Sequence, residues 1–504
     1  MSQAKSCLVL VFGLMGLLLS ACTANRAYRD QGPDPSQQPF VRDSQFNQFE
    51  PYDTAAGKNH HFDFSYIEFD EKGDFWDRRQ LGWTVKEIKE AANTNDVVLV
   101  VYVHGWQNDA STLRDHDVGK FHCLLEHIAE SDAFKHRFFG VYIAWRGKSV
   151  PGGDGWFPDK SPLDLASKAI FFVPHELSFW GRKNVATHTA GLPTTEAIFQ
   201  SVEAVRRSTQ QSGHRSTTIL IGHSFGALVL EKALSQALAA KLLSENGGSS
   251  GSFTAPADFV VLLNAAAESV YAKEMIDMFR RRFQSGSGSS QEVSAEHPLI
   301  VSITSKADWA TKFLFPIGTN LSNAFGLFRT YEWDNRFGED NDNVSQRQYF
   351  TNTAGHNNLL ISYEAEPVSG TPVDPVYEEK DLCEREMLAA FKQNLDHPET
   401  GPNGQIRFTT GSSSGQEVEW ELRPKRTGQP TTPYWIIEVP HQIIRDHSDI
   451  FNENSIALMS RLFRILNPKP KEGAITMSVP RTMRLLEPGQ KPESKLPAQK
   501  SPTP

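Results

Sequence analysis

The sequence predicts an α/β protein with a mostly parallel central sheet and helices on both faces. Short apolar runs recur along the chain, and the segments between them are long enough for crossover helices. The runs are nearly continuous rather than alternating, which is typical of strands buried on both faces. At 504 residues, 39% hydrophobic and 22% charged, the chain can bury a large core. We expect one elaborated domain over residues 60–467.

Six apolar runs predict the strands of this sheet: residues 97–103, 138–145, 217–221, 259–263, 299–303 and 434–439. Residues 61–70 and 73–83 alternate and predict an antiparallel edge hairpin ahead of them. Residues 405–410 and 417–422 flank a Ser/Gly turn, which predicts a second hairpin inserted before the last strand. Ser/Gly-rich stretches at 244–252 and 285–290 predict inserted loops.

The first 22 residues resemble the signal segment of a bacterial lipoprotein. Lys5 supplies a positive charge, and residues 7–19 form an apolar stretch too short to span a bilayer as the helix of a folded protein. Residues 19–22, Leu-Ser-Ala-Cys, resemble a lipobox, in which the cysteine, here Cys22, is lipidated and becomes the mature N-terminus. An ordinary secretory peptide cut near Ala21 is the alternative.

The residues after Cys22 bear on the membrane that the anchor would enter. Thr23 and Ala24 follow the cysteine, whereas an aspartate often signals retention in the inner membrane, so the resemblance implies the outer membrane of the cell envelope. Residues 23–59 are polar and contain prolines, which predicts a flexible tether. Residues 468–504 are rich in Pro and Lys and predict a disordered tail.

Composition excludes some classes of function. The net charge of −9 and the pI near 6.0 argue against nucleic-acid binding. The chain lacks the C-x-x-C and H-E-x-x-H spacings of zinc sites, so we expect no metal and no cofactor. With Cys22 lipidated, Cys123 and Cys383 remain. Cys123 is expected to be a buried small hydrophobe, and its pairing with Cys383 stays open.

The most informative motif is a G-x-S-x-G pentapeptide at residues 222–226. It follows an apolar strand and precedes a helical segment, which is the context of a nucleophile elbow. A serine in this tight turn, Ser224, projects its hydroxyl clear of the sheet, and Gly222 and Gly226 allow the close approach of neighbouring backbone. We therefore predict that Ser224 is the nucleophile of a serine hydrolase.

A serine nucleophile needs a histidine that accepts its proton and an acid that orients the histidine. Asp308 follows the strand at 299–303 and is the predicted acid, with Glu268 as the alternative. The histidine should lie between the last strand and the last helix, and His447 lies directly before that helix. His441 and His356 are the alternatives.

The oxyanion hole is expected after the strand at 97–103. This strand ends in His104, Gly105 and Trp106, of which the first two would shape the turn. The amide of Trp106, together with the amide of Phe225 after the nucleophile, would donate to the oxyanion.

In their order Ser, Asp, His, and on these elements, the residues resemble the α/β-hydrolase superfamily over about residues 60–467. Within it the chain looks like lipase/esterase-type serine hydrolases, which implies cleavage of carboxylic esters through an acyl-enzyme, without cofactor or metal. Trp106 departs from the H-G-G-G form of several lipases and leaves the acceptance of bulky substrates in question. A peptidase or acyltransferase on the same scaffold, and an inactive lipid-anchored envelope binding protein, are the alternatives.

Two aromatic segments, residues 169–180 and 309–328, are expected beside the site as a lid or acyl pocket, or as ordinary core. The expected partners are therefore a small-molecule ester or lipid substrate and, through Cys22, a membrane.

Overall fold

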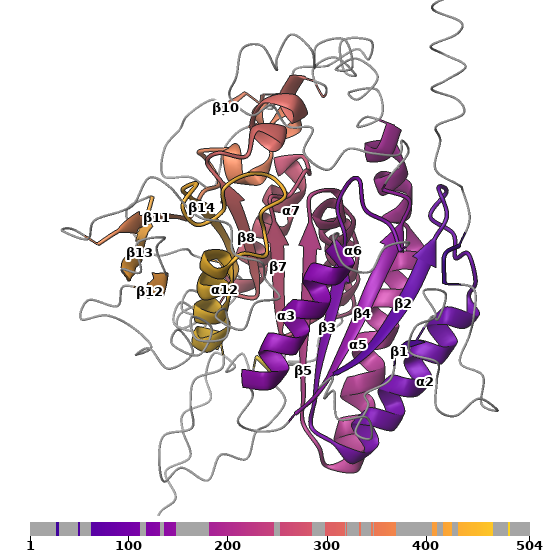
Figure 1. Cartoon of the computed structure of the whole chain (residues 1–504). Helices are drawn as coiled ribbons and strands as arrows, with labels where there is room; N and C mark the ends of the chain where they lie inside the picture. Colours follow the sequence, from indigo (N-terminus) through magenta and orange to yellow (C-terminus); the bar gives the residue numbers. More distant parts are fainter. Residues whose placement is uncertain are drawn as a thin grey trace, which may run out of the picture.

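The computed structural model describes residues 27–29, 49–50, 62–110, 117–131, 136–147, 181–245, 253–284, 298–317, 319, 332–333, 344–345, 347–368, 406–410, 417–425, 432–466 and 482–483. Its centre is an 11-stranded sheet (Figure 1). In spatial order the strands are β1 (Phe49–Glu50), β2 (Phe62–Phe69), β4 (Arg137–Trp145), β3 (Val97–Val103), β5 (Ser216–His223), β7 (Phe259–Leu263), β8 (Ile300–Ser305), β14 (Tyr434–Val439), β11 (Tyr363–Pro367), β13 (Val418–Pro424) and β12 (Ile406–Thr410).

The sheet is mostly parallel, as the sequence predicts. All neighbouring strands from β2 to β11 run parallel. Antiparallel pairing is confined to β1 with β2 at one end and to β13 with β11 and β12 at the other. Two short ladders join β6 (Phe253–Thr254) to β15 (Thr482–Met483) and β9 (Glu332–Trp333) to β10 (Val344–Ser345). Because the parallel strands all end at one edge, here called the carboxyl edge, the loops that follow them gather there.

Helices cover both faces of the sheet. The helices are α2 (Arg79–Thr94), α3 (Asp117–Ser131), α5 (Leu192–Ser212), α6 (Phe225–Glu245), α7 (Ser269–Gln284), α10 (Arg347–Thr351) and α12 (Glu453–Leu466), with a π-helical turn η1 (Ala310–Leu314) and a 3₁₀ turn η2 (Ala354–His356). In Figure 1, α3 and α12 lie in front of the sheet. None of the helices in the described ranges is long and apolar enough to cross a membrane.

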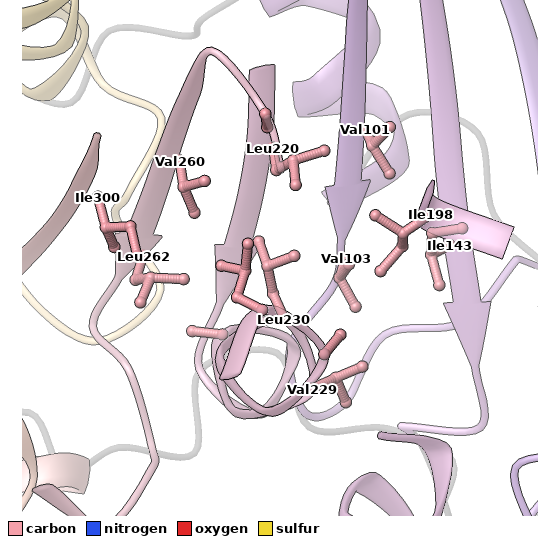
Figure 2. Packing of buried hydrophobic residues seen from close by; sticks show 14 of the residues in the cluster. Val101, Val103, Ile143, Ile198, Leu220, Val229, Leu230, Val260, Leu262 and Ile300 are labelled. Atoms are coloured by element: carbon pink, nitrogen blue, oxygen red, sulfur yellow. The ribbon is translucent and has the colours of Figure 1, made fainter. Parts of the chain in front are cut away.

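The side chains of each strand divide between two cores. In β3, Val97, Leu99, Val101 and Val103 pack with α2, α5, α6 and α7, whereas Val98, Val100 and Tyr102 pack with α3 and α12. Figure 2 shows Val101 and Val103 in the first core beside Ile198 of α5 and Val229 of α6. Burial on both faces explains why these strands are apolar throughout.

The predicted N-terminal hairpin is wrong. Its first half is β2, which pairs in parallel with β4 and is buried along all eight residues, and its second half overlaps helix α2. The alternation that suggested an edge strand comes from polar residues that are buried but paired. Asp63 accepts a hydrogen bond from Arg137 at 2.6 Å, and Ser65 bonds to Thr84 of α2 at 2.5 Å.

The hairpin predicted before the last strand is confirmed as β12 and β13. It does not lie beside β14, because β11, which the sequence did not reveal, pairs with both β14 and β13. Glu364 and Glu366 interrupt the apolar pattern of β11, and they meet Lys425 and Arg423.

Two short pieces of the segment predicted as a flexible tether contact the domain. Residues 49–50 form β1, and residues 27–29, here called the docked segment, lie against the carboxyl end of β2. Arg29 is buried, with its guanidinium 4.0 Å from the centre of the Tyr66 ring.

A buried carboxyl group links α6 to the start of β14. Tyr434 donates its hydroxyl hydrogen to Glu231 Oε1 at 2.7 Å. Burial raises the pKa of Glu231 to about 8, against the smaller lowering effect of this hydrogen bond.

Candidate active site

Ser224 lies in the turn between β5 and α6 with a φ of 55°, a backbone conformation that non-glycine residues rarely adopt. The flanking glycines permit the turn. A Cβ on Gly226 would lie 2.0 Å from the carbonyl oxygen of Val103, and a Cβ on Gly222 would lie 2.8 Å from Cα of Ala227. The close approach involves backbone atoms, so larger residues could not be accommodated by a change of side-chain rotamer.

The structure brings Ser224, His447 and Asp308 together. The Ser224 hydroxyl donates to Nε2 of His447 at 2.7 Å, and Nδ1 of His447 donates to Oδ2 of Asp308 at 2.9 Å. The three come from the turns after β5, β8 and β14, which meet at the carboxyl edge. These directions correspond to the neutral Nδ1–H tautomer of His447 facing an ionised Asp308.

The electrostatics of this pair favour a basic imidazole. Burial alone would lower the pKa of His447, but the charge of Asp308 and its hydrogen bond outweigh it and raise the pKa above the ordinary 6.5. Burial would conversely raise the pKa of Asp308, and the facing His447, with hydrogen bonds from His447 and Thr311, lowers it instead. The pair thus keeps Asp308 charged and His447 a good proton acceptor.

Asp308 has further support on its far side. Thr311 donates its hydroxyl hydrogen to Oδ2 of Asp308 at 2.5 Å, and Nε2 of His356 donates to the Thr311 oxygen at 3.1 Å. Burial lowers the pKa of His356 to about 4, against the opposing charge of Asp308, so this imidazole is neutral near pH 7. His356, which the sequence left open as the catalytic histidine, therefore lies behind the acid, with Thr311 between them.

Neither His441 nor Glu268 takes part in the bonded series. His441 is exposed at the start of the loop that leads to His447. Glu268, which the sequence left open as the acid, accepts a hydrogen bond from Lys183 at 2.5 Å. The Lys183 side chain in turn lies 4.4 Å from the centre of the Phe315 ring.

The loop after β3 lies directly against Ser224. A Cβ on Gly105 would lie 2.9 Å from Cβ of Ser224, so only glycine fits there. His104 holds the turn: its Nδ1 donates to the Gly105 carbonyl at 2.8 Å, and its Nε2 accepts from the Trp145 amide at 3.0 Å. Trp106 follows in the same loop, and Phe225 is the first residue of α6, so both are sequence neighbours of residues in contact at the site.

Two side chains that sequence analysis missed bind the backbone carbonyl oxygen of His447. Nε2 of His223 donates to the His447 carbonyl oxygen at 2.9 Å, and the side-chain amide of Asn264 donates to the same oxygen at 3.0 Å. Nδ1 of His223 lies 3.5 Å from Asp117, which also accepts the Tyr102 hydroxyl at 2.7 Å. Asn264 has a φ of 44°, a second strained residue beside Ser224.

Each missed residue had a weak signal in the sequence. His223 stands inside the pentapeptide, and Asn264 directly follows the apolar run of β7, where polar residues reach the carboxyl edge. Thr311, which supports Asp308 and which sequence analysis also missed, stands three residues after it, the spacing at which a helical turn brings side chains together.

One expectation about the nucleophile is wrong. The sharp turn was expected to leave the Ser224 hydroxyl exposed, but Ser224 is fully buried, as are Asp308 and, nearly so, His447. The hydroxyl is thus shielded from bulk solvent. Burial lowers the effective dielectric constant around the three side chains and so strengthens the electrostatic interactions among them.

Of the aromatic segments expected beside the site, residues 169–180 lie outside the described residues. The other begins with helical residues 309–317, in which Leu314 and Phe315 are buried while Trp309, Phe313 and Ile317 are exposed. Cys123, expected to be a buried small hydrophobe, is partly buried and disulfide-bonded; Cys22 and Cys383 lie outside the described residues. Within the described ranges, no group of three or more His, Cys, Asp or Glu residues is arranged to hold a metal ion.

Comparison of the chain with known protein families, with curated proteins and with solved structures found no match.

Proposed function

We propose that this protein is a serine hydrolase of the α/β-hydrolase type that cleaves carboxylic esters through an acyl-enzyme on Ser224. The observation that carries the proposal is the bonded series Ser224, His447, Asp308 at the carboxyl edge of a parallel sheet. The strained backbone at Ser224 and the two close glycine contacts are further support, because a surface serine needs neither.

The chemistry follows from these contacts. His447 removes the proton of the Ser224 hydroxyl as its oxygen attacks the ester carbonyl. The amides of Trp106 and Phe225 stabilise the oxyanion, and each such donor contributes about 10²- to 10³-fold in rate. His447 then gives its proton to the departing alcohol, and water repeats the cycle on the acyl-enzyme. Asp308 stays ionised and fixes the imidazole tautomer.

The proposed location is the cell envelope of a bacterium, with a lipid anchor on Cys22 in the outer membrane. The disulfide of Cys123 supports an extracytoplasmic site, because disulfides persist in oxidising compartments.

Fluorophosphonate labelling tests the nucleophile. We expect the wild-type protein to be labelled and Ser224→Ala to lose the label, while Ser216→Ala, at the opposite end of the same strand, keeps it. Folded wild-type protein that takes no label would favour the inactive binding protein.

A substrate panel then tests the reaction class. We expect esters of short to medium acyl chains to be hydrolysed faster than amides of similar size. Faster amide cleavage, or preferential transfer to an added alcohol or amine, would replace the esterase by a peptidase or an acyltransferase.

A further inference from the structure

The docked segment, five to seven residues after the proposed lipid anchor, contacts the catalytic end of the domain. The amides of Tyr28 and Arg29 donate to the two carboxylate oxygens of Glu68 at 2.8 and 2.7 Å. Glu68 is the penultimate residue of β2, so these bonds lie at the carboxyl edge. Gln80 of α2 completes the contact by donating its side-chain amide to the Arg29 carbonyl at 2.8 Å.

The Arg29 side chain reaches further into the same edge. Its Nε donates to the Ala110 carbonyl at 3.2 Å, and a terminal nitrogen donates to the Tyr66 hydroxyl at 3.1 Å. Ala110 belongs to the loop that begins with His104 and carries Gly105 against Ser224. The docked segment therefore contacts the loop that forms one wall of the candidate active site.

The length of chain before Arg29 limits how far this edge can lie from a membrane. Arg29 follows Cys22 by seven residues. Even a fully extended chain of that length spans only about 25 Å, so a lipid on Cys22 would lie within about that distance of the docked segment. A lipid on Cys22 would thus hold the carboxyl edge close to the bilayer, whatever the length of the segment that follows Arg29.

The same edge carries exposed apolar side chains. Four large hydrophobic side chains are exposed in the described part of the chain: Leu192, Trp309, Phe313 and Ile317. Trp309, Phe313 and Ile317 are four residues apart on the helical stretch after β8, so they share one face. Leu192 begins α5 near the start of α2, where Glu196 and Arg78 pair. All four lie at the carboxyl edge. None of the exposed large hydrophobic side chains in the described part of the chain lies at the opposite edge of the sheet.

From these observations we infer that the carboxyl edge is a membrane-facing surface, held against the bilayer by the docked segment, and that the substrate is an amphiphilic ester taken from that bilayer. The inference rests on the proposed lipid anchor and hydrolase activity. The domain would then hold a fixed orientation to the membrane, whereas a flexible tether over residues 23–59 would leave its orientation free.

A pair of insertions tests the orientation. A flexible Gly/Ser linker of about 30 residues, which adds about 30 Å of mean reach, is inserted either between Asn25 and Arg26 or between Ser36 and Gln37. The upstream insertion lengthens the path from Cys22 to the docked segment, whereas the downstream one leaves that path unchanged and serves as the matched control.

The lipidated proteins are reconstituted in vesicles that carry acceptor-labelled lipids, with a donor fluorophore introduced at position 192. We expect energy transfer to fall for the upstream insertion only. Hydrolysis of a long-chain ester in the vesicles should fall several-fold for the same variant, while hydrolysis of a short water-soluble ester should be equal in all three proteins. Equal energy transfer in both insertions would overturn the inference, because it would mean that the docked segment does not hold the domain.

A surface charge tests the membrane contact itself. Ile317→Glu should lower energy transfer and hydrolysis of the vesicle ester, because a carboxylate at a bilayer surface is unfavourable, and Thr94→Glu at the opposite edge should change neither. Indistinguishable behaviour of the two would count against a bilayer on this face. Since energy transfer does not depend on catalysis, a failure of the hydrolase proposal would show instead as absent fluorophosphonate labelling with the distance pattern intact.

Discussion

Asp308 controls the proton affinity of His447. The proposed hydrolase needs a neutral His447 before it binds substrate, so we expect kcat/KM to rise with pH through the pKa of this residue, with an inflection above 6.5. In Asp308→Asn the negative charge is lost while burial, which lowers the pKa, remains. We expect the inflection to move to lower pH and the rate to fall by about 10³- to 10⁴-fold.

The matched control is Glu268→Gln, since the Glu268 carboxylate pairs with Lys183 rather than with His447. Its pH profile for hydrolysis of a soluble ester should keep the wild-type inflection. A shifted inflection in the control, or an unshifted one in Asp308→Asn, would remove Asp308 from its assigned role.

Asn264 positions His447 through the backbone. Asn264→Gly tolerates the φ of 44°, so the turn is kept while the side-chain bonds to the carbonyls of His447 and Asp446 and to the amide of Ser305 are lost. We expect kcat to fall by about 10- to 100-fold with little change in KM, because a small displacement of the base misaligns proton transfer. The control is Asn358→Gly, whose exposed side chain bonds only to Lys425 among the contacts described. A loss in KM alone would point to a role in substrate binding instead.

The packing of α6 against β3 depends on a missing side chain. In Gly226→Ala the new methyl group would overlap the Val103 carbonyl, and we expect unfolding free energy to fall by about 1–3 kcal/mol or more. Gly82→Ala, in a helix where nothing lies within 4 Å of the new Cβ, should instead raise stability by about 0.5–1 kcal/mol. Urea unfolding measures both, and similar losses in the two variants would show that the close contact does not decide the cost.

Strands buried on both faces were the most predictable elements. The six predicted runs all correspond to strands of the parallel sheet, because their apolar pattern follows directly from double burial. The pattern failed where polar residues are buried in pairs, as at Asp63 of β2, or exposed in ion pairs, as at Glu366 of β11. Such pairs join residues distant in sequence, so no local window contains the reason for their burial.

The candidate site followed the same rule. Ser224 was predictable because Gly222 and Gly226 stand within two residues of it. Asp308 and His447 were predictable because few acidic residues and histidines follow the ends of the last strands. The support for His447 from His223 and Asn264 could not be predicted, since both contacts form only when the turns after β5, β7 and β14 meet.

At the scale of the whole molecule, the ends of the chain were the least predictable part. Residues 23–59 have the composition of a tether, yet Arg29 is buried in the domain. Its burial depends on Glu68, Tyr66 and Ala110, which belong to the β2 and β3 regions of the fold. A polar composition predicts that a segment is disordered on its own. It does not show whether the folded domain offers a site to which the segment binds.

The Glu231–Tyr434 pair has a consequence for the whole fold. The carboxyl group keeps its proton up to about pH 8 in the folded state, whereas an unfolded chain releases it near 4.5. Between these values the unfolded chain binds fewer protons, so stability decreases as the pH rises.

Glu231→Gln preserves an acceptor for Tyr434 and carries no ionisable group, and we expect its urea midpoint to change less between pH 5 and 8 than that of the wild type. Parallel slopes in the two proteins, with surface Glu196→Gln as reference, would contradict this. The interior thus holds one hydrogen ion as a structural component, and this single group makes the fold lose stability as its surroundings become alkaline.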